Sequence, residues 1–335
     1  VVLERKLTEL GRDLVEQEDP VDALELDDHV DDDVLRLMFT ACHPVLAPDA
    51  RVALTLKMVA GLSTEEIARA FVVQTTTMAA RITRAKKALS AAQVPFEVPV
   101  GDELAARLAS VLGAVYLMFN EGYTATAGEA WARPALCAEA MRLGRMLAAL
   151  EPASEVLGLV ALMEIQASRL PARTDRRGAP VTLLDQDRSR WDRLLITHAL
   201  DALGRAATGE PGPYLLQALI AACHALAVLA EDTDWTEIAR LYGVLVDVTG
   251  SPIVELNRAV AVSMADGPQA GLAIVDSLLD VPALAGYHLL PSVRGDLLVK
   301  LGRPAEARAE FQRAAAQTSN AAERSLLLAR AADCV

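Results

Sequence analysis

The strongest constraint on the fold is a pair of helical segments separated by a turn of only three residues. The first segment begins at Ser63 or Thr64, where Glu66 is placed to close a capping box on Ser63. Residues 72–74 form the turn, and the second segment continues to about Leu89. Two helices joined in this way are typical of a helix-turn-helix, whose second helix enters the major groove of DNA.

The second helix divides into an apolar face and a face suited to DNA. The predicted inner face consists of Met78, Ile82, Ala85 and Leu89. Small polar side chains at its start fit the groove, and arginines further on can contact phosphate or guanine. The predicted DNA-binding residues are Ser63, Thr64, Gln74, Thr75, Thr76, Thr77, Ala79, Arg81, Thr83, Arg84, Lys86 and Lys87. The alternative is an ordinary helical hairpin with a solvated basic face.

Charge is distributed unevenly along the chain. The 335 residues carry a formal net charge of −13, which excludes a protein that coats nucleic acid with its whole surface. No acidic residue lies between Glu66 and Glu97, a window that holds five basic ones. Proximity to phosphate accounts for such a window. In contrast, Asp13 to Asp33 holds eleven acidic residues and no basic one, which predicts a solvated linker or a mimic of nucleic-acid charge.

The middle of the chain, residues 93–208, is predicted to be a helical domain that begins at a proline-broken joint. Its expected helices span 102–119, 129–149, 152–170 and 186–204. Gly122 is expected to stop the first helix. Asn120 and Glu121 are then expected to cap helix ends and hold a buried turn, with a polar site formed by Asn120, Glu121 and Tyr123 as the alternative. The segment 170–193 is rich in both charges and is interpreted as a salt-bridged surface loop, with an anion site as the alternative.

The last part, residues 209–335, contains a repeat. Ala261, Gly295 and Ala329 are spaced by 34 residues, and so are Ala273 and Ala307. Together with Phe311 and Ala314, this spacing resembles the tetratricopeptide (TPR) pattern, in which small residues let paired helices approach closely. The predicted pairs are 253–265 with 268–280 and 289–301 with 304–317. A further pair is expected over 213–249, with a closing helix from Asn320. Such repeats present a concave surface to protein partners.

Signals for an enzyme, a cofactor or a metal are poor. The sequence has no glycine-rich phosphate loop and no HExxH or GxSxG motif. We expect Cys42-His43 and Cys223-His224 to pack in the core rather than to bind zinc. The four cysteines are far apart, which predicts a reduced, cytoplasmic setting. The longest apolar stretch, residues 215–230, is short for a membrane span and is interpreted as a core helix.

The stretch from Leu54 to Leu89 resembles region 4 of extracytoplasmic-function (ECF) RNA polymerase sigma factors. The resemblance is carried by Gly61-Leu62-Ser63, by Glu66-Ile67-Ala68, and by Thr77-Met78 with Arg81 and Arg84-Ala85. It implies that residues 74–84 read the −35 promoter element. It also implies the RNA polymerase core as partner, through its β-flap and β′ subunits. Candidates for the flap-docking face, or for the domain core, are Leu35, Leu37, Met38, Phe39 and Val45.

The same resemblance organises the whole chain. Residues 1–33 match the acidic linker that joins region 2 to region 4 and would run through the RNA-exit channel. Region 4 itself covers 34–92, and the subgroup in question carries a long helical extension, which we expect to regulate activity. Region 2 should precede the linker, so we interpret the chain as a fragment. The sequence therefore predicts an all-α protein: a sigma region 4 helix-turn-helix followed by a TPR-like helical extension.

Two other functions remain open at this point. One is a stand-alone helix-turn-helix regulator with a helical sensor domain, which binds DNA without polymerase. The other is a TPR-type scaffold whose helix-turn-helix has lost its contact with DNA. Neither predicts a membrane partner or a catalytic residue.

Overall fold

The computed structural model describes residues 33–71, 73–123, 134–175, 181–206, 211–318 and 321–334. Within these ranges all regular secondary structure is helical, so the predicted all-α class is confirmed. The chain forms two compact units, the first ending at Glu151 and the second beginning at Pro152. The predicted four-part division is finer than this and stays a prediction.

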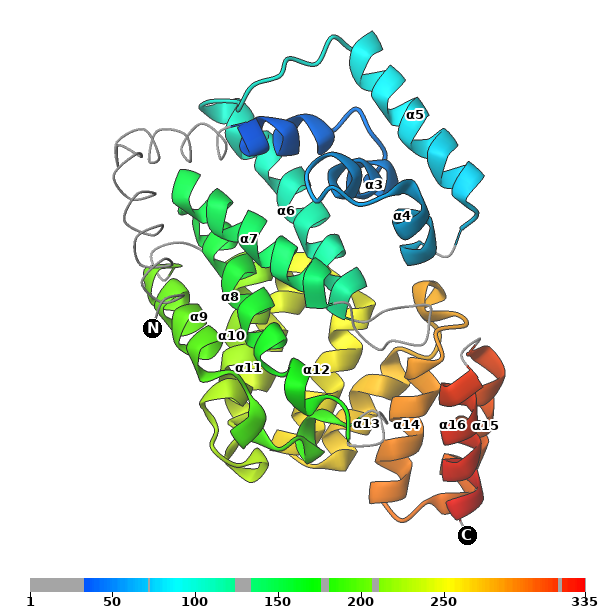
Figure 1. The fold of residues 1–335 in the computed structure, drawn as a ribbon. Helices are drawn as coiled ribbons and strands as arrows, with labels where there is room; N and C mark the ends of the chain where they lie inside the picture. Colours follow the sequence, from blue (N-terminus) through cyan, green and yellow to red (C-terminus); the bar gives the residue numbers. More distant parts are fainter. Residues whose placement is uncertain are drawn as a thin grey trace, which may run out of the picture. The chain divides into compact units, whose positions relative to one another are not determined.

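The first unit contains the predicted helix-turn-helix. Its helices, in chain order, span residues 33–41 and then α3 (Pro48–Met58), α4 (Thr64–Ala70), α5 (Thr75–Ala91), α6 (Asp102–Tyr123) and α7 (Pro134–Leu150) (Figure 1). Gly61 follows α3 with a φ of +67°, a left-handed conformation that favours glycine.

The core of this unit joins α5 to the helices before it. Met78, Ile82 and Ala85 of α5 are buried, as predicted, while Leu89 is half-buried. They share the interior with fully buried side chains such as Leu56 of α3 and Ile67 of α4. Helix α3 packs against α4, α5 and α6, so the inner face of α5 is fixed and its outer face is left over for other contacts.

The helix that follows the proline joint packs against the helix-turn-helix unit. Ser110 Oγ of α6 donates a hydrogen bond to the carbonyl oxygen of Cys42, 2.5 Å away. The prediction that Gly122 stops this helix was wrong, because α6 continues through Tyr123. A Cβ at position 122 would lie 2.9 Å from the backbone nitrogen of Cys137 in α7. Gly122 therefore serves the close approach of α6 and α7.

The end of α6 also places the predicted polar residues. Asn120 and Glu121 lie half-buried in its last turn, and the Tyr123 ring is buried and stacks on Phe119 with 5.6 Å between ring centres. They lie within the helix, so they do not follow its end as expected.

The second unit is a series of antiparallel helices (Figure 1). Its helices are α8 (Ser154–Ser168), α9 (Arg193–Ala206), α10 (Pro213–Leu226), α11 (Trp235–Thr249), α12 (Pro252–Ala265), α13 (Pro268–Ser277), α14 (Leu289–Lys300), α15 (Pro304–Gln317) and α16 (Ala321–Asp333). The bounds of the predicted repeat pairs agree with α10 to α16 to within about three residues. The helix predicted over 186–204 begins only at Arg193, because Asp192 caps it by accepting the N–H groups of Leu194 and Leu195.

The loop before α9 is held by a buried arginine. Nη1 of Arg188 donates to the carbonyl oxygens of His224 and Ala227, each at 2.8 Å, and Nη2 donates to Thr233 Oγ1 at 3.0 Å. The guanidinium also lies over the Trp191 ring. This contact joins the loop to the C-terminal end of α10 and to the segment before α11.

Several charged side chains of segment 170–193 make hydrogen bonds and ring contacts, and its predicted salt bridges stay a prediction. Asp185 accepts from the Thr182 hydroxyl, and Asp187 accepts from the Ser189 backbone and hydroxyl. Arg169 donates to the Gln186 side chain and lies over Trp191. Arg176 and Arg177, which were part of the prediction, lie outside the described residues.

The repeat packs as expected in one pair, but its spacing differs from the prediction. Gly295 of α14 meets Phe311 of α15: a Cβ at position 295 would lie 2.7 Å from Cε1 of the ring. In the preceding pair, Gly271 of α13 makes the close approach to Ser263, and Ala273 is exposed. The expected equivalence of Ala273 and Ala307 was therefore wrong.

The reason for this shift is the length of the connections. Helix α13 begins at Pro268 and α15 at Pro304, so these second helices of each pair are 36 residues apart instead of 34. Gly271 consequently takes the place that Ala307 has in α15. The turns themselves are as predicted, with Gly267 and Gly302 at φ values of +97° and +70° before prolines that start helices.

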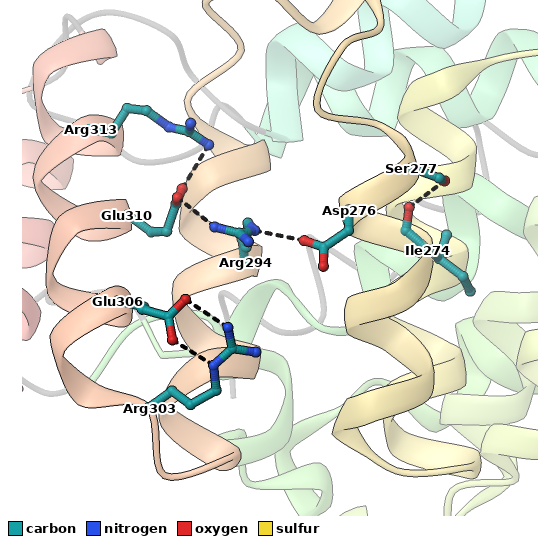
Figure 2. A network of polar contacts seen from close by, with 8 residues as sticks. All are labelled: Ile274, Asp276, Ser277, Arg294, Arg303, Glu306, Glu310 and Arg313. Atoms are coloured by element: carbon teal, nitrogen blue, oxygen red, sulfur yellow. Dashed lines mark hydrogen bonds and ion pairs between the residues drawn. The ribbon is translucent and has the colours of Figure 1, made fainter.

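Charged side chains join successive helices of the repeat (Figure 2). Arg294 of α14 donates through Nε to Asp276 of α13 and through Nη1 to Glu310 of α15, both at 2.8 Å. Glu310 also pairs with Arg313 within α15. Because Arg294 contacts both neighbouring helices, it fixes how α13, α14 and α15 stack.

Candidate nucleic-acid interface

The first helix of the motif begins at a reciprocal cap. Ser63 Oγ accepts the Glu66 backbone N–H at 3.1 Å, and Glu66 Oε2 accepts the Ser63 N–H at 2.7 Å. The predicted capping box is thus confirmed. Hydrogen bonds to its carboxylate from the Ser63 backbone N–H and hydroxyl lower the pKa of Glu66, because they stabilise its charged form. The cap fixes where α4 starts and hence the angle at which it meets α5.

The start of α5 presents small and polar side chains to solvent. Gln74 is the N-cap residue, and it is exposed together with Thr75, Thr76, Thr77 and Ala79. Further along, Thr83, Arg84, Lys86 and Lys87 are exposed as well. Ser63 and Thr64 are half-exposed at the start of α4. Val72, which belongs to the predicted turn, lies outside the described residues.

The exposed face of α5 carries positive charge without a compensating carboxylate of its own. The helix Thr75–Ala91 contains four cationic residues and no acidic one. Arg84 is exposed, and its Nε donates to the Ala80 carbonyl oxygen at 3.3 Å. An exposed cationic surface of groove-sized side chains is the arrangement that binds phosphate and reads base edges.

Arg81 differs from the other predicted residues. Its guanidinium carbon lies 5.6 Å from the centre of the Phe71 ring, and its Nη1 lies 3.7 Å from Asp49 Oδ2. The side chain is half-buried among α3, α5 and the end of α4. The structure therefore places Arg81 at the joint between these helices, apart from the exposed residues of α5.

Sequence reasoning missed one exposed residue of α5 and the two partners of Arg81. Ala80 is exposed four residues after Thr76 and four before Arg84, and this helical spacing could have identified it. Asp49 and Phe71, the partners of Arg81, could not be found from spacing, because they depend on how α3 and α4 pack on α5.

The structure also separates the residues predicted to form either a docking face or the core. Met38 and Phe39 are fully buried and Leu35 is nearly so, which makes them core residues. Leu37 is half-buried. Val45 is 48% exposed and is available for a partner.

One member of each cysteine–histidine pair, Cys42 or His224, packs in the interior, whereas His43 and Cys223 are half-buried. Cys42 is buried with its Sγ 3.2 Å from Thr55 Oγ1, and burial raises the pKa of its thiol to about 11. His224 is buried edge-on against Trp235, and Cys223 is half-buried. The expected core packing is confirmed for Cys42 and His224. Across the described ranges, no group of three or more histidine, cysteine or acidic residues is arranged to hold a metal ion.

Residues 215–226 of the longest apolar stretch lie in α10, a helix of 14 residues inside the second unit. The rest of the stretch follows the end of this helix, where Val228 and Leu229 are exposed, so the predicted core helix is shorter than expected. Of the helices in the described part of the chain, none has both the length and the apolar character needed to cross a membrane.

Comparison with known proteins places this interface in a family. Residues 36–89 match the family "Sigma-70, region 4", and residues 107–207 match a family of unknown function, DUF6596. The chain is 49% identical over 297 residues to the uncharacterized protein R00370 of Rhizobium meliloti, which covers 88% of this chain and 70% of that protein. No solved structure matches the chain. The chain therefore belongs to the same family as the Rhizobium meliloti protein, with a sigma-70 region 4 domain followed by helices that include the DUF6596 domain.

Proposed function

We propose that α5 reads the −35 element of promoters as part of an RNA polymerase holoenzyme. The observation that carries the proposal is the exposed tip of α5, where Gln74 to Thr77 stand free of the core on a helix anchored by the capping box of α4. The resemblance of residues 54–89 to ECF sigma factors supports the assignment to that subgroup.

The charge of the chain supports a role that depends on polymerase. A net charge of −13 opposes the approach of free DNA, and the longest stretch without acidic residues is the window around α5. Attachment to the polymerase core brings this window to DNA in spite of the repulsion. We propose that region 4 docks on the β-flap with a surface that includes Val45. A protein that acts as part of RNA polymerase lies in the cytoplasm, which is the location that we propose.

We further propose that the helical extension regulates this activity through a TPR-like surface that takes a protein partner. Because α6 packs on α3, a truncation that tests this role should spare α6 and α7 and remove the chain after Glu151. Loss or gain of target transcription on truncation of the full-length protein supports regulation. Unchanged transcription contradicts it.

The experiment that tests the DNA-reading role is selection of duplexes from a random library, with this chain alone and with RNA polymerase core added. We expect enrichment of one short sequence when core is present and much weaker enrichment without it. Equal enrichment in both cases would instead identify a stand-alone regulator. If no sequence is enriched in either case, our proposal is contradicted, and the scaffold function is favoured instead.

A further inference from the structure

The loop before α9 contains a buried positive charge that has no salt bridge. The described part of the chain buries four charged side chains, and three of them, Arg107, Glu164 and Glu310, pair with an ionisable group. Arg188 is the fourth. Its guanidinium donates to neutral oxygens, and no carboxylate of the described residues lies within salt-bridge distance of it. A buried charge in this situation calls for a counter-ion.

Asp232 acts on Arg188 from too far away to serve as that counter-ion. Its side chain is exposed, and its Oδ2 accepts the backbone N–H of Leu229 at 3.3 Å. Burial lowers the pKa of Arg188, and the charge of Asp232 offsets this effect only in part. The positive charge of the loop therefore stays largely uncompensated by the described residues.

Arg188 belongs to a group of four side chains that gather at one indole ring. The guanidinium carbons of Arg188 and Arg169 lie 5.2 Å and 5.6 Å from the centre of the Trp191 ring. Nη1 of Arg188 also lies 2.8 Å from the carbonyl oxygen of His224. Burial, and then the charges of both arginines, lower the pKa of His224 to about 4, so its imidazole is neutral at pH 7. We call Arg169, Arg188, Trp191 and His224 the Arg188 cluster.

The Arg188 cluster contains buried nitrogen atoms that make no hydrogen bond. These are Nε of Arg188, Nε1 of Trp191 and Nδ1 of His224, and none of them has a partner among the described residues. Five other buried side-chain atoms of the described chain lack a hydrogen bond, but three of those five belong to a salt bridge. Most of the atoms that have neither kind of contact therefore lie in this one cluster.

The chemistry of these atoms favours an anion. The N–H groups of an arginine and of an indole can only donate, and a neutral imidazole donates from Nδ1 when its proton is there. A water molecule could accept from these groups, but it would leave the charge of Arg188 uncompensated. An anion accepts from the same groups and neutralises the charge, and charge-assisted hydrogen bonds of this kind are the stronger ones.

We propose that the Arg188 cluster binds a small monoanion, a halide or a compact carboxylate, which accepts from Nε of Arg188 and Nε1 of Trp191. The size follows from burial: Arg188, Trp191 and His224 are only 5%, 3% and 8% exposed, so the site is closed to larger ions. The anion-site alternative for segment 170–193 agrees with this, because Arg188 and Trp191 belong to that segment. The site is independent of the DNA-reading role of α5.

The bound anion stabilises the second unit. Arg188 joins the loop before α9 to the end of α10 and to Thr233, which precedes α11. A ligand that binds this folded arrangement and not the unfolded chain raises stability as its concentration increases. The stability of the second unit should therefore depend on which small anion is present, and not on ionic strength alone.

Chloride-35 NMR on the whole chain at pH 7 tests the proposal, because exchange of chloride with a protein site broadens its resonance. We expect saturable broadening, with chloride binding at least about tenfold weaker in Arg188→Met, which removes a charged donor. Arg190→Met is the matched control. It removes the same charge at an exposed position two residues away, and it should leave the broadening unchanged.

Acetate, added at constant ionic strength, distinguishes the two kinds of anion. Narrowing of the chloride resonance by acetate would show that the site takes a compact carboxylate as well as a halide. An unchanged resonance would show that it takes the halide alone. Either result agrees with a site for a small monoanion.

A second variant keeps the test valid if Arg188→Met does not fold. Trp191→Phe retains an aromatic ring and loses only the indole N–H, and we expect chloride to bind about three- to tenfold more weakly. Replacing gluconate, which is too bulky for the site, by chloride should raise the unfolding temperature of the native chain. The expected rise is about 3–5 °C for each tenfold increase above the dissociation constant. Absence of broadening, or broadening that Trp191→Phe and a folded Arg188→Met both leave unchanged, overturns the proposal.

Discussion

The guanidinium carbon of Arg81 lies 5.6 Å from the centre of the Phe71 ring, and this contact joins the second helix of the motif to the end of the first. Asp49 of α3 completes the joint, with its carboxylate 3.7 Å from Arg81. A residue that the sequence pattern assigns to DNA thus has a structural position, whereas Arg84, one turn further on, is exposed.

Replacing the two arginines should separate stability from DNA binding. Arg81→Ala removes the contact with the Phe71 ring, and we expect it to lower the free energy of unfolding by about 1 kcal/mol. Arg84→Ala should change it by less than about 0.5 kcal/mol, because the side chain is exposed. Urea titration followed by circular dichroism measures both. Equal destabilisation by the two substitutions would contradict the structural assignment of Arg81.

The capping box should make a measurable contribution to the first unit. Ser63→Ala removes the acceptor for the Glu66 N–H, at an expected cost of about 1 kcal/mol. The destabilisation caused by Ser63→Ala should be smaller in acid, because the Ser63 hydroxyl also hydrogen-bonds to the charged Glu66 carboxylate. The pKa of folded Glu66 is lowered, so the stabilisation is present above the ordinary pKa and is lost as the pH falls through the folded value. Ser90→Ala, at an exposed position of α5, is the control and should be nearly neutral.

The close approach of α14 and α15 predicts a penalty for even one methyl group. Gly295→Ala places a Cβ against the Phe311 ring, and we expect a loss of about 1–3 kcal/mol in thermal or urea unfolding. Gly243→Ala in α11 is the matched control. No atom lies within 4 Å of its Cβ position, so the helix should gain about 0.5–1 kcal/mol. A stabilising Gly295→Ala would show that the two helices are further apart than described.

Buried Arg188 should be among the most sensitive positions of the second unit. Arg188→Met leaves the carbonyl oxygens of His224 and Ala227 and the Thr233 hydroxyl without their donor. We expect a loss of about 3 kcal/mol. Arg190→Met, two residues away and exposed, should cost less than about 0.5 kcal/mol. Similar unfolding midpoints for the two variants would refute the proposed clamp.

The lowered pKa of buried His224 should make the stability of the second unit depend on pH. Burial, and then the charges of Arg169 and Arg188, lower its pKa from 6.5 to about 4. The unfolded chain therefore takes up a proton below pH 6.5 that the folded chain takes up only near pH 4. The free energy of unfolding should fall by up to about 3 kcal/mol over this window as the pH is lowered. His224→Phe should remove that part of the dependence, and an unchanged pH profile would contradict it.

Local signals in the sequence were sufficient for much of the fold. The capping box at Ser63, the glycines before Pro268 and near Pro304, and the spacing of Met78, Ile82 and Ala85 act over a few residues, and the structure agrees with them. They fixed the position of the helix-turn-helix and of the repeat pairs.

Predictions failed where contacts between residues far apart in the sequence determine the role of a residue or the spacing of a repeat. Glycine ends helices in many proteins, but at position 122 the close approach of α7 to α6 explains why a glycine is present. Arg81 has the spacing of a DNA contact, yet its neighbours Phe71 and Asp49 hold it. The equivalence of Ala273 and Ala307 failed because the connections between helices differ in length, which a fixed spacing cannot reveal.

The central claim is that the exposed face of α5 reads DNA, and binding of the selected duplex in the presence of RNA polymerase core tests it most directly. Fluorescence anisotropy should show that Arg84→Ala weakens binding by about 1–3 kcal/mol, whereas Arg205→Ala, an equal change of charge on an exposed residue of α9, leaves it unchanged. Thr76→Asp, which adds a negative charge at the exposed start of α5, should weaken binding as well. Equal effects of Arg84→Ala and Arg205→Ala would contradict the claim. So would unchanged binding of both Arg84→Ala and Thr76→Asp.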